Sequence, residues 1–338
     1  MRSAMDLRLS VAPMMDWTDP AFRWLLRQIT TRTRLYTEMV PAQALWHGRA
    51  ERFLARSDVE HPVALQLGGS DPAQLAHGAR LGARWGYDEI NLNVGCPSDR
   101  VQSGRFGACL MREPELVRTL VTAMAEASDR PVTVKCRIGV DELDDFASLC
   151  RFTEAVVAAG AQALIVHARK AWLKGLSPKQ NREIPPLRYD RVEALKDAFP
   201  ALPIVLNGGI ETLDQGMPWI DRLDGVMIGR AAYHDPWLLA QADARVFGDA
   251  PASGHSRASV ALAYRDYVAA RLRPDVPVSR YTRHLTGLFQ GQPGARVWRR
   301  ALSQGAADKS AGAEIIDQAL AARRAAIERH AASTAESA

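Results

Sequence analysis

The alternation of short apolar segments with longer amphipathic ones, from residue 9 to about residue 230, constrains the fold of this chain most strongly. Eight apolar segments are rich in Val, Ile and Leu, as is typical of parallel strands buried on both faces. They are Leu9–Met14, Leu35–Met39, Val63–Leu67, Glu89–Asn93, Val132–Arg137, Ala163–His167, Ile204–Asn207 and Gly225–Ile228. Eight strands, most of them followed by a helical segment, predict an α/β fold of the (β/α)8 TIM-barrel type.

The segments between these strands support helices. Asp71–Arg84, Pro114–Ala127 and Asp145–Ala159 are amphipathic, and the first two carry a proline where a helix begins. The alternative architecture is a doubly wound sheet, but no glycine-rich dinucleotide fingerprint follows the first strand. A polar insertion, Arg169–Tyr189, interrupts the alternation of strands and helices between the sixth and seventh strands.

The C-terminal part of the chain is predicted to be an all-helical domain. Its expected helices are Ser259–Leu272, Tyr281–Phe289, Ala295–Leu302 and Ala313–His330. A stretch with Pro and Gly near Gly248–Gly254 precedes them, so we expect a barrel domain over residues 1–250 and a helical domain over residues 251–338.

The positive charge is concentrated in this C-terminal part. Residues 255–338 hold 13 Lys and Arg against 7 Asp and Glu, whereas the rest of the chain holds 30 against 31. This asymmetry favours a polyanionic partner such as a nucleic acid. The alternative is a compositional bias, because the chain has 37 Arg and only 6 Lys.

Several protein classes are excluded by the sequence. No apolar run approaches the roughly 18 residues that span a bilayer, and Met1–Leu9 lacks the apolar stretch of a signal peptide. Four cysteines do not make a disulfide framework in 338 residues, which favours a reducing cytoplasm. No Cys or His spacing matches a zinc motif, so no metal is expected.

Polar and glycine-bearing segments follow the predicted strands, where barrel enzymes build their active sites. They are Ala12–Met15, Gln66, Asn91–Pro97, Lys135 with Arg137, His167 with Arg169, Asn207–Gly209 and Gly229-Arg230. The last two are where barrels commonly bind a phosphate, through glycine backbone N–H groups and an arginine. The alternative is a pair of ordinary glycine turns.

Lys135 and His167 each lie near the end of an otherwise apolar strand. A lysine there needs an electron-rich partner, so Lys135 either forms a Schiff base with a carbonyl substrate or donates to the edge of a flavin ring. His167 alone is compatible with a hydrogen-bonded core histidine. Together with Gln66 and Asn207, the pair indicates a planar cofactor with a phosphate tail, such as FMN.

Cys96 lies in a Gly-Cys-Pro turn just after the fourth strand. A thiol with a pKa near its usual value of roughly 8.5 is a proton donor near neutral pH, and it is a nucleophile if that value is lowered. Cys109, Cys136 and Cys150 are expected to be inert small hydrophobic residues.

The chain resembles the tRNA-dihydrouridine synthase family. The motifs that carry this resemblance are Ala12–Asp19, Gln66–Gly69, Asn91–Ser98, Val134–Arg137, Asn207–Ile210 and Gly229-Arg230. The insertion Gly175–Leu187 is similar to the A subfamily in particular. The resemblance covers nearly the whole chain; only the tail after about Gly305 lacks recognisable motifs.

This resemblance implies an enzyme that reduces the C5–C6 double bond of uridines 20 and 20a in the tRNA D-loop, with FMN as cofactor and NADPH as reductant. It implies that Cys96 is the general acid and that Asn93 faces the substrate uridine. The implied flavin ligands are Pro13, Met14, Met15, Gln66, Lys135 and His167 for the ring, and Asn207, Gly208, Gly209, Gly229 and Arg230 for the phosphate end. The implied tRNA contacts are Lys179, Arg182, Arg296 and Arg299. We expect a cytoplasmic monomer.

Three other functions compete with this interpretation. The first is an FMN barrel that acts on a free pyrimidine, like dihydroorotate dehydrogenases, which gives no role to a basic C-terminal domain. The second is a Schiff-base aldolase that uses Lys135 without a flavin. The third is a non-catalytic RNA-binding barrel, which leaves Cys96 unexplained.

Overall fold

The computed structural model describes residues 5–48, 50–250, 256–308 and 310–336. The chain divides into two compact units, here called unit 1 (Met1–Pro20 and Arg32–Gly229) and unit 2 (Ala21–Thr31 and Arg230–Ala338). The domain boundary predicted between residues 250 and 251 adjoins residues 251–255, which lie outside the described residues, and it stays a prediction.

Unit 1 contains a barrel of parallel strands, which confirms the predicted (β/α)8 TIM-barrel fold. The strands pair in the order β1-β9-β8-β7-β6-β5-β4-β2, and β3 also pairs with β4. They are β1 (Leu9–Val11), β2 (Leu35–Tyr36), β3 (Val40–Pro41), β4 (Val63–Gly68), β5 (Glu89–Val94), β6 (Val132–Arg137), β7 (Leu164–His167), β8 (Ile204–Asn207) and β9 (Gly225–Ile228). The barrel closes where the Val11 N–H donates to the Arg34 carbonyl (2.9 Å) and the Arg34 N–H donates to the Leu9 carbonyl (3.1 Å).

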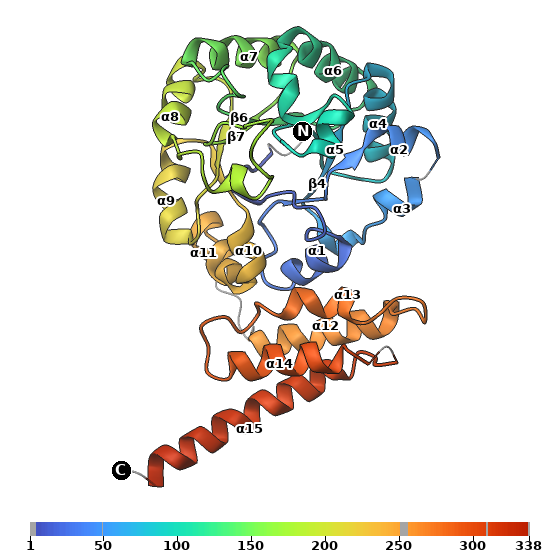
Figure 1. Cartoon of the computed structure of the whole chain (residues 1–338), viewed down its shortest axis with the longest axis vertical. Helices are drawn as coiled ribbons and strands as arrows, with labels where there is room; N and C mark the ends of the chain where they lie inside the picture. The colour runs from blue at the N-terminus through green and yellow to red at the C-terminus, as the bar shows by residue number, and fades with distance from the viewer. Residues whose placement is uncertain (1–4, 49, 251–255, 309, 337–338) are drawn as a thin grey trace. The chain divides into compact units, whose positions relative to one another are not determined.

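Helices α4, α6, α7, α8 and α9 lie outside the strands (Figure 1). The helices of unit 1 are α2 (Ala42–Trp46), α3 (Ala50–Leu54), α4 (Pro72–Arg84), α5 (Asp99–Ser103), α6 (Pro114–Ala127), α7 (Phe146–Ala158), α8 (Tyr189–Ala198) and α9 (Leu213–Arg222), with 3-10 turns η1 (Asp58–Glu60), η2 (Gly107–Arg112) and η3 (Gln180–Arg182). Two of the predicted helix starts are capped by aspartate: Asp71 accepts the Gln74 N–H and Asp145 accepts the Ser148 N–H, both at 2.8 Å.

Two strands differ from their predicted bounds by more than one residue. The first ends at Val11 rather than Met14, because Pro13 has no N–H to donate and the Thr18 N–H donates to the Met14 carbonyl in a turn. The second is divided into β2 and β3, and Thr37 between them uses its hydroxyl to accept the Gln66 N–H at 3.1 Å. The Gln66 N–H therefore bonds to a side chain at the point where the ladder between the two segments is interrupted.

Unit 2 is helical around an aromatic cluster. Its helices are α1 (Pro20–Arg27, from Ala21 on), α10 (Arg230–His234), η4 (Pro236–Gln241), α11 (Ala242–Phe247), α12 (Arg257–Arg271), α13 (Ser279–Thr282), η5 (Arg283–Leu285), α14 (Ala295–Gly305) and α15 (Ile315–Glu336). The Trp24 ring stacks on the Tyr267 ring with centroids 4.5 Å apart. Among the described helices, none is both long and apolar enough to cross a membrane.

The single helix predicted over Tyr281–Phe289 is wrong. The segment is the end of α13, the 3-10 turn η5 and then turns. Gly287 lies against the backbone of His234 so closely that a Cβ there would lie within 3 Å of its carbonyl carbon. The chain turns at Gly287, where the two backbone segments lie close together, and does not continue as a helix. The periodicity of the sequence does not reveal this close approach.

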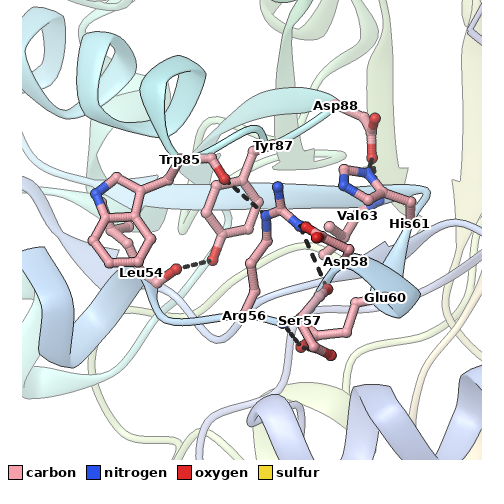
Figure 2. A network of polar contacts seen from close by, with 10 residues as sticks. All are labelled: Leu54, Arg56, Ser57, Asp58, Glu60, His61, Val63, Trp85, Tyr87 and Asp88. Carbon is pink, nitrogen blue, oxygen red and sulfur yellow. Dashed lines mark hydrogen bonds and ion pairs between the residues drawn. The ribbon is translucent and has the colours of Figure 1, made fainter.

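A network of polar contacts lies at the N-terminal edge of the barrel, before β4 and β5 (Figure 2). The Arg56 guanidinium donates through Nε to the Trp85 carbonyl (2.8 Å) and lies 5.7 Å from the centroid of the Tyr87 ring. The Asp88 carboxylate contacts Nδ1 of His61 and accepts the Val63 N–H, both at 2.6 Å. Residues at this edge of a barrel serve stability, because the active site forms at the opposite edge.

We expect Arg56→Ala to lower the free energy of unfolding by about 1–2 kcal/mol, because it removes a partly buried hydrogen bond and the packing on Tyr87. Chemical denaturation measures this loss. Asp58→Ala is the matched control, since the Asp58 side chain is fully exposed (101%) although it contacts Arg56 at 3.3 Å. An equal loss of stability in both variants would contradict the assignment.

Candidate active site

Five polar side chains from consecutive barrel strands meet at the C-terminal ends of those strands. They are Gln66 on β4, Asn93 on β5, Lys135 on β6, His167 on β7 and Asn207 on β8. Four of them are at most 9% exposed, and Lys135 is partly buried. Neighbouring strands pair Asn93 with Lys135 and His167 with Asn207 in register, whereas Gln66 pairs with Asn91, two residues before Asn93 on β5.

Lys135 and Asn207 form a hydrogen-bonded pair at this edge. The Lys135 Nζ donates to Asn207 Oδ1 at 2.9 Å, and Asn207 Nδ2 donates to the Met227 carbonyl at 2.7 Å. Burial, and then the Arg137 guanidinium, lower the pKa of Lys135 to about 8. The ammonium therefore gains from a partner that carries negative charge.

His167 lies among cationic groups. Burial and the nearby Arg137, Lys135 and Arg169 hold the pKa of His167 well below its usual range. The imidazole is therefore neutral near pH 7, and one ring nitrogen donates while the other accepts. A site with this surplus of positive charge suits an anionic ligand.

Gly208 and Gly209 form a cradle beside His167. Their φ values are +106° and +76°, which favour glycine. A Cβ at Gly208 would lie 2.5 Å from His167 Cδ2, and a Cβ at Gly209 would lie 2.6 Å from the Tyr189 hydroxyl. That hydroxyl donates to the Gly208 carbonyl at 2.7 Å. The sequence analysis missed Tyr189, which is the last residue of the predicted insertion and the first of α8.

Cys96 lies in a loop whose backbone is fixed on both sides. Its N–H donates to Asn93 Oδ1 at 3.0 Å, and its carbonyl accepts the Ala108 N–H at 2.9 Å. The half-buried thiol lies 3.5 Å from the Ser98 hydroxyl. Gly107, with φ +77°, must be glycine because a Cβ would lie 2.5 Å from the Cys96 carbonyl oxygen.

The other three cysteines have the properties of packed thiols. Burial raises the pKa of Cys136 to about 12, and it also raises the pKa values of Cys109 and Cys150. A raised pKa disfavours the reactive thiolate. Among the described residues, no group of His, Cys, Asp and Glu forms a candidate metal site.

Arg137 joins the Cys96 loop to the insertion, a function that the sequence analysis did not predict. Its guanidinium donates to the carbonyls of Gly95 (3.2 Å), Lys170 (3.2 Å) and Asn181 (2.8 Å). Gln102 makes a second connection, with Nε2 2.8 Å from the carbonyls of Pro97 and Leu173. A cavity of about 490 Å³ lies between the two segments, lined by Asp99, Gln102 and Leu173–Ser177.

The other predicted site residues lie in a turn, after a strand, at helix ends and beside a second cavity. Pro13–Met15 form the turn after β1, where Met15 is 54% exposed. A Cβ at Gly229 would meet only Ala12, at 3.8 Å, and Arg230 is the first residue of α10. Lys179 and Arg182 are exposed at the two ends of η3. In unit 2, Arg296 and Arg299 line a cavity of about 330 Å³ at the beginning of α14.

Comparisons with known proteins give a consistent result. The profile of the family described as "Dihydrouridine synthase (Dus)" matches residues 10–326. A tRNA-dihydrouridine(20/20a) synthase of Xanthomonas campestris pv. campestris is 56% identical over 314 residues, which cover 93% of each chain. Proteins of the same name are 54% identical in Shewanella oneidensis (92% of each chain) and 52% identical in Vibrio cholerae (93% of this chain and 96% of that protein).

Proposed function

Because the chain belongs to the dihydrouridine synthase family, we propose that it reduces uridines 20 and 20a of tRNA to 5,6-dihydrouridine, with FMN as cofactor and NADPH as reductant. The observation that carries the proposal is the position of Cys96, whose backbone N–H donates to Asn93 at the strand ends that also carry Lys135 and His167. One edge of the barrel thus combines a proton donor with a cationic set of ring-binding groups.

The residues at this edge fit FMN. The glycine cradle lets backbone approach a phosphate, and the enclosed cations Lys135 and Arg137 favour an anion. Lys135, His167, Gln66 and the Pro13–Met15 turn would hold the ring, as the resemblance implies. Asn207, Gly208, Gly209, Gly229 and Arg230 would hold the phosphate end. When bound and reduced, FMN supplies a hydride for C6 of the uracil.

The chemistry that remains is the delivery of a proton. The C5–C6 double bond of uracil is conjugated to the C4 carbonyl, so addition at C6 moves negative charge toward C5 and O4. The Cys96 thiol then donates its proton to C5, and Sγ becomes a thiolate that takes a proton from solvent. Asn93 holds the loop backbone during this transfer. Among its described contacts, one Nδ2 hydrogen is used by Gln66, and the second is available for the base.

Recognition of tRNA requires a base to leave its stack, so the protein must hold the surrounding RNA. We assign this function to Lys179 and Arg182 on the insertion and to Arg296 and Arg299 on α14. All four are basic, and Lys179, Arg182 and Arg296 are exposed. The Arg299 guanidinium donates to Gln290 Oε1 at 3.1 Å, which holds the side chain at the rim of its cavity. We further propose that the protein acts as a monomer in the cytoplasm, where its tRNA substrate and reduced thiols are found.

We expect the double variant Arg296→Ala, Arg299→Ala to raise KM for tRNA and to reduce the salt dependence of binding by about two units of slope. Binding of tRNA at several salt concentrations measures this. The matched control replaces Arg324 and Arg329, which are exposed on α15 and carry the same charge. Flavin content and flavin reduction should not change. If both double variants weaken tRNA binding equally, the excess of arginine in the C-terminal part attracts tRNA only through its net charge, and Arg296 and Arg299 make no specific contact.

A direct test of the function uses the purified protein. We expect yellow absorbance from bound FMN, bleaching by NADPH, and reoxidation by undermodified tRNA but not by uridine or orotate. Reoxidation by a free pyrimidine would favour the dihydroorotate-dehydrogenase-like alternative. A protein that neither contains nor binds FMN would contradict both flavin-dependent functions.

A further inference from the structure

A series of buried polar side chains runs through the barrel interior toward the Cys96 loop. Residues 89, 91 and 93 alternate along β5 and therefore share one face of the strand. The register pairs Asn91 with Gln66 on β4 and with Thr133 on β6. The members of this series, here called the polar chain, are Glu89, Thr133, Asn91, Gln66 and Asn93, and each is at most 8% exposed.

The upper half of the polar chain holds the Cys96 loop. Asn93 Oδ1 accepts the N–H groups of Gly95 (3.1 Å) and Cys96 (3.0 Å). Asn93 Nδ2 donates to Gln66 Oε1 at 2.8 Å, and Gln66 Nε2 donates to Asn91 Oδ1 at 2.7 Å.

The lower half ends at a carboxylate. Asn91 Nδ2 donates to the Thr133 hydroxyl at 2.7 Å, and that hydroxyl donates to Glu89 Oε1 at 2.5 Å. The Tyr36 hydroxyl donates to the same oxygen at 2.7 Å, and Arg34 Nη1 lies 3.4 Å from Glu89 Oε2. Burial and the Glu89 charge raise the pKa of Tyr36 well above its usual value, so Tyr36 stays a neutral donor.

Every hydrogen bond of the polar chain donates in the direction of Glu89. The groups at both ends of the chain allow only this direction. At the upper end, backbone N–H groups can only donate, so Asn93 must present its carbonyl oxygen. At the lower end, a carboxylate can only accept, so Thr133 must donate and must receive a bond from Asn91. The amides between the ends have one orientation that satisfies every group.

We propose that Thr133 is a positioning residue for Cys96: it transmits the orientation set by the Glu89 carboxylate through Asn91, Gln66 and Asn93 to the Cys96 backbone. The proposal rests on the function of Cys96 proposed above. Without the Thr133 hydroxyl, the amides lose their fixed direction. A reversed Asn93 would place its NH₂ group against the N–H of Cys96, and the loop would move away from the position that delivers the proton.

The test compares variants that each replace one of the two residues whose hydroxyl donates to Glu89. Thr133→Val breaks the polar chain, Thr133→Ser preserves the hydroxyl, and Tyr36→Phe removes the other hydroxyl donor to the same oxygen. In Thr133→Val we expect kcat for dihydrouridine formation to fall about 10- to 100-fold, because small displacements of a reacting group have effects of this size. KM for tRNA should not change. Thr133→Ser should restore kcat, and Tyr36→Phe should retain it.

Alkylation of Cys96 by iodoacetamide, followed by mass spectrometry, gives a readout independent of turnover. It should accelerate several-fold in Thr133→Val but not in Thr133→Ser or Tyr36→Phe. Unchanged kcat and alkylation in Thr133→Val, or equal losses in Thr133→Val and Tyr36→Phe, would overturn the proposal. If the wild-type protein forms no dihydrouridine, the proposed function fails, and the alkylation rates alone decide whether Thr133 positions Cys96.

Discussion

Cys96→Ala is expected to lower the rate of dihydrouridine formation by about 10²- to 10⁴-fold, the usual contribution of a general acid. FMN should remain bound and should still be reduced by NADPH. The substitution removes only the thiol and leaves the proposed flavin-binding residues Lys135 and His167 and the glycine cradle unchanged. Single-turnover reduction of undermodified tRNA measures the loss.

The matched control for Cys96→Ala is Cys150→Ala, a half-buried cysteine on α7 whose pKa burial raises. It should turn over like the wild type. Turnover of Cys96→Ala close to that of the control would contradict the role of Cys96, and proton delivery from solvent would then have to explain the reaction.

Lys135→Met is expected to raise the stability of the FMN-free protein and to lower its affinity for FMN. The pKa of Lys135 is lowered to about 8, so below pH 8 the folded protein holds an ammonium that would be better solvated in the unfolded chain. After the loss of the bond to Asn207 is subtracted, the FMN-free variant should gain on the order of 2 kcal/mol at pH 7. FMN affinity should fall at least about tenfold.

The pH dependence of the Lys135→Met effect follows from proton linkage. Between the folded pKa of about 8 and the unfolded value of 10.5, the unfolded wild-type chain binds more protons, so wild-type stability rises with pH. The advantage of the variant should therefore decrease between pH 7 and pH 9.5, where chemical denaturation of both FMN-free proteins measures it. A variant that is less stable than the wild type at pH 7 would contradict the account.

Much of the barrel could be predicted from the sequence, because buried parallel strands leave apolar segments of recognisable length. The predicted bounds Val132–Arg137, Ile204–Asn207 and Gly225–Ile228 match β6, β8 and β9. The division of the second strand into β2 and β3 was not predictable, since it depends on the Thr37 hydroxyl and its partner on β4.

The candidate site, too, could be predicted from the sequence only in part. Its members end strands, so the positions of Lys135, His167 and Asn207 at one edge follow from the fold. The connections between them depend on register and loop packing, which no local pattern encodes. Arg137 bonds to residues 42 and 44 positions away, and the polar chain needs the pairing of β4, β5 and β6.

The central claim is that the protein reduces specific tRNA uridines with a flavin. It is tested most directly by incubating the purified holoenzyme with NADPH and unmodified tRNA transcript, and by mapping dihydrouridine at each D-loop position. We predict dihydrouridine at positions 20 and 20a and none when NADPH is omitted. A transcript that remains unreduced at both positions, with flavin bound and reduced, would contradict the claim.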